Sequence, residues 1–158
     1  MIKFDLQWDE KIPKGDIDTV TSGFCTATVN KNLIWNKLSA NWIEFLEHLI
    51  ASWDSIFMDG SLKSNASEID RFEYELNHDL AKGIKRKIAP SILIYRYGND
   101  FEIQIGEQKL RPTYVEISNA LNFIGNSISQ RISKHQDPRA RAAVAKWGKR
   151  KQHKNGHR

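Results

Sequence analysis

The spacing of apolar residues, which changes repeatedly along the chain, is the strongest constraint on its fold. Over residues 2–8 apolar and polar side chains alternate, which is typical of a strand with one buried face. Residues 91–97 and 101–105 show the same tendency on either side of a Gly-Asn-Asp turn at 98–100. This arrangement predicts a β-hairpin.

Two further strands are predicted near the N-terminus. Residues 19–29 are rich in Thr, Val and Phe, which favour strands. The Asn-Lys-Asn sequence at 30–32 predicts a turn, because Asn tolerates positive φ. We therefore expect residues 33–35 to pair back as a short strand.

Helical spacing is clearest over residues 39–53 and extends toward Phe57. Trp42, Leu46 and Leu49 lie on one face of this predicted helix, and Ser39 is its predicted N-cap. The same face is expected to be buried in the core.

Three more helices are predicted. One covers residues 68–80, where apolar residues recur at helical spacing. Another begins after Thr113, the predicted cap, and continues to about residue 132. A short helix is expected over residues 140–147.

This order of elements favours the α+β class, with an antiparallel sheet of about five strands packed against two or three helices. We expect residues 1–132 to form the globular domain and residues 133–158 to form a basic C-terminal tail, partly helical and then disordered. Because the tail carries little of the apolar pattern, a chain that ends at Ile132 is expected to keep its fold.

Composition excludes several classes of protein. The single cysteine, Cys25, excludes an internal disulfide framework and a Cys-based zinc finger. No apolar run approaches the roughly 20 residues that a membrane span requires, and the first residues lack the apolar core of a secretory leader. We expect a cytoplasmic protein with no membrane contact.

Charge is distributed unevenly along the chain. Residues 1–130 hold 14 Lys and Arg against 18 Asp and Glu, whereas residues 131–158 hold 10 against a single acid. This asymmetry predicts a polyanion-binding segment, and the alternative is a tail that only increases solubility. The predicted nucleic-acid-binding residues are Arg131, Lys134, Arg139, Arg141, Lys146, Trp147, Lys149, Arg150, Lys151 and Lys154.

Trp147 has two interpretations. Basic residues interleaved with an aromatic ring can hold phosphates while the ring stacks on a base. Alternatively, Trp147 anchors the last helix to the body, and this interpretation is slightly favoured because Ala143 and Val144 nearby are apolar.

Motifs that would identify a reaction are missing from the sequence. No H-E-x-x-H pair, phosphate-binding glycine loop or G-x-S-x-G elbow occurs, so no cofactor and no metal site are expected. Cys25 lies in a predicted strand and is interpreted as a core residue.

His78 and Asp79 form the one polar pair that suggests a site. His78 lies at a predicted helix end, where it is interpreted first as a capping residue. In the functional interpretation it lines a pocket beside Arg86, Tyr95 or Tyr97.

Several short stretches resemble the N-terminal region of longer bacterial proteins related to ImmA/IrrE-type metallo-endopeptidases. They are the strand that ends at Trp8, residues 41–47 and 77–80, Pro90 with its hairpin, and the helix that ends in Gln130-Arg131-Ile132. The resemblance spans about residues 2–147. It implies a non-catalytic accessory or sensing domain associated with mobile elements and stress or defence, because the peptidase H-E-x-x-H segment is missing.

The sequence therefore favours a non-enzymatic interaction module. The body is expected to bind a protein partner or itself, and the tail to bind DNA or RNA through phosphates without reading sequence. One alternative is a small metal-dependent nuclease built on His78, Asp79 and nearby acids. Another is a subunit of a larger complex whose tail docks on a partner.

Overall fold

The computed structural model describes residues 2–9, 11, 14–57, 70–75, 91–97, 100–105 and 108–150. Its elements in chain order are β1 (Ile2–Trp8), α1 (Ile17–Val20), β2 (Ser22–Val29), β3 (Asn32–Asn41), α2 (Trp42–Phe57), β4 (Asp70–Glu75), β5 (Ser91–Tyr97), β6 (Asp100–Ile105), β7 (Gln108–Leu110), α4 (Tyr114–Ile132) and α5 (Pro138–Lys149).

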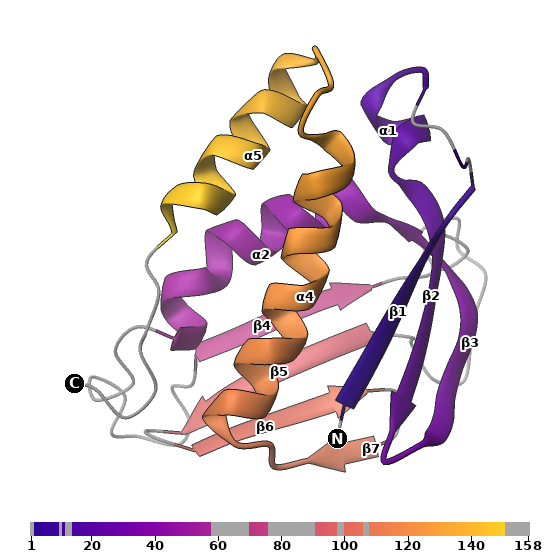
Figure 1. Ribbon diagram of the computed structural model, residues 1–158. Helices are drawn as coiled ribbons and strands as arrows, with labels where there is room; N and C mark the ends of the chain where they lie inside the picture. Colours follow the sequence, from indigo (N-terminus) through magenta and orange to yellow (C-terminus); the bar gives the residue numbers. More distant parts are fainter. Residues whose placement is uncertain are drawn as a thin grey trace.

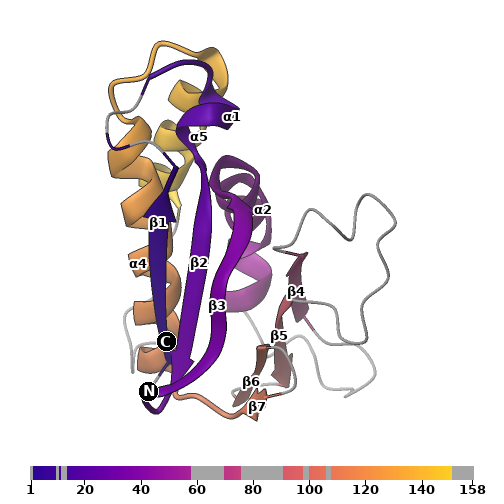
Figure 2. The ribbon, with the colours of Figure 1, turned by 90° about the vertical axis from the view of Figure 1, so that its right-hand side faces the viewer.

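The strands form two antiparallel sheets beside a layer of helices (Figures 1 and 2). One sheet has the order β1-β2-β3 and the other the order β4-β5-β6-β7. The α+β class is thus confirmed, but the expected single sheet of about five strands is replaced by two. The predicted hairpin is β5–β6, and it pairs with β4 and β7 rather than joining the N-terminal sheet.

The first sheet follows from the alternation that opens the chain. Phe4 lies opposite Ala27 and Leu6 lies opposite Cys25 in the β1–β2 register. Phe4, Cys25 and Ala27 are buried, while Lys3 is exposed on the other face. The alternating apolar side chains therefore point toward the helices.

The helix predicted over residues 68–80 is wrong in its described part, because Asp70–Glu75 is strand β4. In this short stretch Phe72 and Tyr74 alternate with charged residues, a spacing of two that suits a strand. Pairing of all six residues with β5 decides between the two patterns.

Helix α2 begins three residues after the predicted cap. Strand β3 continues through Ser39 to Asn41, and the Asn41 side chain then accepts a hydrogen bond from the Glu44 backbone N–H (3.2 Å). Helix α1 was not expected from the sequence, and its Asp16 cap accepts from the Thr19 N–H (2.9 Å). In both places the helix begins after a capping Asn or Asp next to strand-forming residues. A single capping residue is too short a pattern to locate the start of a helix.

Helix α4 agrees closely with its prediction. The Thr113 side chain accepts from the Glu116 N–H (3.1 Å), and the Glu116 carboxylate accepts from the Thr113 N–H (3.0 Å). This reciprocal capping box fixes the start of the helix. None of the helices in the described part of the chain is long and apolar enough to span a membrane.

Helix α5 contributes to the same core as the rest of the molecule. Ala140, Ala143 and Trp147 are buried in one cluster with residues of α2, α4 and the first sheet. Residues 133–150 are therefore part of the globular body, which corrects the expectation that the domain ends at residue 132. Small alanines gave this segment a weak apolar pattern, yet they allow close packing against α2 and α4.

Candidate nucleic-acid interface

Helix α5 carries most of the predicted nucleic-acid-binding residues, and local signals fix its ends. The Asp137 side chain accepts from the Arg139 backbone N–H (2.7 Å), and Pro138 occupies the first turn, where no backbone donor is needed. Lys146 and Lys149 lie in the last turn, where positive charge favours the helix dipole.

Trp147 anchors α5 to the body. Its side chain is 3% exposed, and its indole Nε1–H donates to Asn126 Oδ1 at 2.9 Å. The ring packs edge-on against Trp53, with centroids 5.2 Å apart. A Cβ atom at Gly125 would lie 2.1 Å from the Trp147 ring, so glycine is required there for this close approach. The structure thus supports the anchoring interpretation of Trp147.

Arg150 packs over the same aromatic cluster. Its guanidinium carbon lies 3.4 Å from the centroid of Trp147 and 4.8 Å from that of Trp53. The guanidinium also donates to Asn122 Oδ1. Burial lowers the pKa of Arg150 to about 10. These contacts hold the Arg150 side chain at the end of α5.

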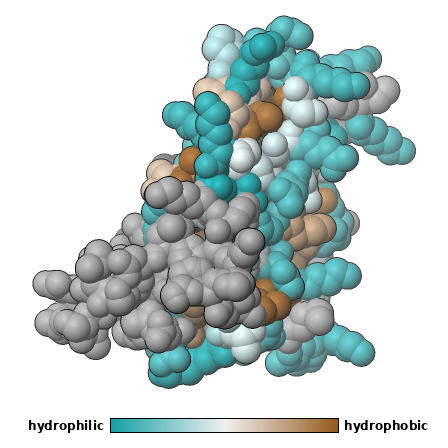
Figure 3. Space-filling view, turned by 60° about the vertical axis from the view of Figure 1, so that its left-hand side comes forward, coloured by the Kyte–Doolittle hydropathy of each residue, from teal (hydrophilic) through white to brown (hydrophobic). Residues whose placement is uncertain are grey.

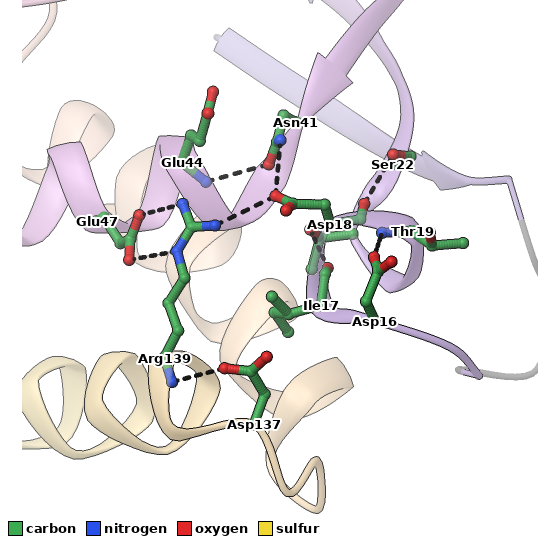
Figure 4. A network of polar contacts seen from close by, with 11 residues as sticks. Asp16, Ile17, Asp18, Thr19, Ser22, Asn41, Glu44, Glu47, Asp137 and Arg139 are labelled. Atoms are coloured by element: carbon green, nitrogen blue, oxygen red, sulfur yellow. Dashed lines mark hydrogen bonds and ion pairs between the residues drawn. The ribbon is translucent and has the colours of Figure 1, made fainter.

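Arg139 joins α5 to α2 and α1 (Figure 4). Its Nε and Nη2 donate to the two oxygens of Glu47 at 2.8 and 2.6 Å, and its Nη1 donates to Asp18 Oδ1 at 3.2 Å. The hydrogen bonds to Glu47 raise the pKa of Arg139. Asn41 also donates to Asp18 (3.2 Å), so the network ties three helices to the end of β3.

The end of α4 is tied to the N-terminal part of the chain. Arg131 donates through Nε to the Val20 carbonyl oxygen (3.0 Å), and its guanidinium lies 4.5 Å from the Trp8 ring centroid. His135 Nδ1 accepts from the Asp137 N–H, which places the ring proton on Nε2, where it donates to the Gly15 carbonyl oxygen (2.9 Å).

Four of the predicted cations remain exposed. Lys134 lies in the turn between α4 and α5, and Arg141, Lys146 and Lys149 lie on α5. Within the described ranges none of them forms an ion pair or a hydrogen bond. Hydrophilic side chains dominate the upper half of the molecule, where α5 lies (Figure 3).

The exposed cations border two surface hollows. Lys134 and Arg141 border an open hollow of about 730 Å³ in the bend between α4 and α5. Lys146 borders a smaller hollow between α2 and α5, together with Arg139 and Glu47. The α5 surface and the preceding turn thus offer exposed cations beside two hollows, and such cations can contact phosphate groups.

The other predicted site residues are not tested. Lys151 and Lys154 lie outside the described residues, as do His78, Asp79 and Arg86. Tyr95 and Tyr97 belong to β5, but their side chains are outside the description. The predicted pocket therefore stays a prediction.

Groups with metal-binding or nucleophilic chemistry do not gather in the described ranges. No cluster of three His, Cys, Asp or Glu side chains there could hold a metal ion. Cys25 is fully buried, and burial raises the pKa of its thiol to about 12, which disfavours the reactive thiolate.

Comparison with known proteins gave no match: no family model, curated protein or solved structure resembles this chain significantly. The relation to ImmA/IrrE-type proteins is therefore neither supported nor opposed by these comparisons.

Proposed function

We propose that the protein is a non-enzymatic interaction module that binds nucleic-acid phosphates through the outer face of α5 and the preceding turn, and a protein partner through its body. One observation carries the nucleic-acid part of this proposal. Three arginines of the basic segment are held in internal contacts, whereas Lys134, Arg141, Lys146 and Lys149 remain exposed.

The sequence around this face supports the proposal. From Pro138 to the end of the chain there is no Asp or Glu, so exposed cations there lack a neighbouring acid in sequence. Such a surface attracts a polyanion and makes contacts with its backbone. Since the sequence of α5 contains no recognisable base-reading motif, binding is expected to be tolerant of sequence.

The setting is also part of the proposal. We place the protein in the cytoplasm, as an accessory component of a bacterial mobile-element, stress or defence system. The support for this setting is the resemblance of short segments to the N-terminal region of ImmA/IrrE-type proteins.

Salt dependence provides the direct test. If the four exposed cations each meet one phosphate, the log–log slope of affinity against salt is about −3.6 on duplex DNA and about −2.8 on a single strand. Engagement of Lys151 and Lys154 as well would increase the duplex slope to about −5.4. Fluorescence anisotropy at several salt concentrations measures both slopes.

A matched pair of variants locates the interface. In the test variant Lys134, Arg141, Lys146 and Lys149 are replaced by Gln; in the control variant Lys3, Lys31, Lys109 and Arg111 are replaced. Both sets contain three Lys and one Arg, and all eight are exposed. We expect only the test variant to lose most of the slope. Equal loss in both variants would show that net charge alone causes binding, and would contradict the assigned interface.

A further inference from the structure

Strand β1 has an open edge. It pairs only with β2 among the described strands, and the hydrogen bond from Asp9 N–H to Ser22 O fixes the alternation of its backbone groups. By that alternation the N–H and C=O groups of Ile2, Phe4 and Leu6 point away from β2. Within the described residues no hydrogen bond reaches these outward groups.

An apolar groove lies beside this edge. It has a volume of about 320 Å³ and lies between β1 and α4. Phe123 on α4 is 52% exposed, an unusual state for a large aromatic side chain, and it lines the groove. The described residues that line it are Ile2, Lys3, Phe4, Glu116, Asn119, Ala120 and Phe123.

We propose that the β1 edge and this groove together bind an extended segment of a partner protein as an added strand. The outward groups of β1 would pair with the backbone of the segment. Alternate apolar side chains of the segment would enter the groove and cover Phe123. The proposal locates the protein-binding part of the proposed function and does not depend on nucleic-acid binding.

Geometry favours a lone segment over a second copy of this chain. Paired strands lie about 4.8 Å apart, whereas packed helices need about 8–10 Å between axes. Helix α4 lies behind β1 and packs against it (Figures 1 and 2). Symmetric pairing of two β1 strands would force the two α4 helices too close together.

Charge on β1 further defines the segment. Lys3 and Asp5 are exposed on the outer face of the strand, two positions apart. A segment that pairs antiparallel with β1 is therefore stabilised by an acid opposite Lys3 and a base opposite Asp5.

The sequence of β1 itself provides a probe with this charge order. In a peptide of residues 2–8 paired antiparallel to β1, with Phe4 opposite Phe4, the peptide's Asp5 lies opposite Lys3 and its Lys3 lies opposite Asp5. As a free peptide it carries no α4 and avoids the clash. A control peptide with Lys3 and Asp5 exchanged has the same composition but places like charges opposite each other.

The test measures peptide affinity by anisotropy and amide hydrogen exchange on the whole protein. We expect the first peptide to bind at least tenfold more tightly than the control and to slow exchange at Ile2, Phe4 and Leu6. A protein with Lys3→Asp and Asp5→Lys should reverse the preference. Equal affinities, or protection elsewhere, would overturn the proposal.

Two surface variants complete the test. Phe123→Asp should weaken peptide binding at least tenfold, whereas Leu33→Asp, at another exposed apolar residue on β3, should not. Both should keep the salt-dependent DNA affinity within about twofold, so that failure of this proposal is distinguishable from failure of nucleic-acid binding. A dimer of the protein that Phe123→Asp dissociates would assign the edge to a second copy and overturn the proposal.

Discussion

Trp147 shows how one residue in a basic segment can serve the fold rather than a ligand. It is buried, bonded to Asn126 and packed on Trp53. We expect Trp147→Ala to lower the free energy of unfolding by about 3–5 kcal/mol, measured by denaturant melts. Under conditions where the variant is folded, its affinity for single-stranded DNA should be unchanged. A stable variant that loses about 1–3 kcal/mol of single-strand affinity would instead show base stacking.

Trp42 provides a second test at the residue scale. Its side chain is fully buried, and its indole Nε1 finds no hydrogen-bond partner among the residues that the structure describes. Trp42→Ala should cost about 3–5 kcal/mol of stability through the cavity it leaves. Trp42→Phe removes an unsatisfied donor, which offsets part of that loss, so we expect a cost of less than about 2 kcal/mol. Thermal and denaturant melts measure both costs. If the two variants lose the same stability, the assigned burial of an unpaired N–H is contradicted.

The carboxyl of Glu116 makes α4 sensitive to acid. The hydrogen bond from the Thr113 backbone N–H lowers the pKa of Glu116 below its ordinary value of 4.5. Because the folded state then binds fewer protons, the stabilisation is complete above the unfolded pKa and is lost as pH falls through the folded pKa. Stability measured at pH 6 and pH 3 should therefore differ less in Glu116→Gln than in the parent. An identical difference would contradict the role of the capping box.

At the scale of the element, α5 has two faces with different roles. Arg139 connects α5 to α2 through Glu47, whereas Arg141 is exposed. We expect Arg139→Gln to lower stability by no more than about 1 kcal/mol, because the pair is partly exposed, and to change DNA affinity little. Arg141→Gln should leave stability unchanged and reduce the duplex salt slope by about 0.9. Melting curves and salt titrations on both variants separate the two roles. If Arg139→Gln reduces the salt slope and Arg141→Gln does not, α5 binds nucleic acid through the face that carries Arg139.

The elements that could be predicted from sequence are those with long periodic patterns or complete caps. The Thr113 and Glu116 pair and the apolar spacing of α4 specify that helix almost to the residue. Strand β4 could not be predicted because its six residues fit both the helical and the strand spacing. Pairing with β5, which the sequence does not show, selects the strand. Likewise the basic character of the interface is visible in sequence, but the partners of Arg139 are not, because Glu47 is 92 residues away in the chain.

At the scale of the whole molecule, the basic segment is held by the body through contacts distant in sequence. Arg131 reaches Val20, Arg139 reaches Glu47, and Trp147 packs on Trp53. These contacts orient α5 with its remaining cations outward. Which cations can contact a ligand therefore depends on the fold, because arginines held in internal contacts have few N–H donors left for phosphate.

Truncation tests this dependence for the whole molecule. A chain that ends at Ile132 loses Ala140, Ala143 and Trp147 from the core, and Trp53 loses the edge-on contact with the Trp147 ring. Contrary to the expectation from sequence, we predict a much lower melting temperature or insolubility for this chain.

A chain that ends at Arg150 retains every described contact and all four exposed cations, so it should melt as the full chain does. Its duplex slope should fall by no more than about 2.7, the combined share of Lys151, Lys154 and Arg158. If the chain ending at Ile132 melts at the parental temperature, or if the chain ending at Arg150 loses all salt-dependent binding, α5 is not the shared structural and binding element inferred from its contacts.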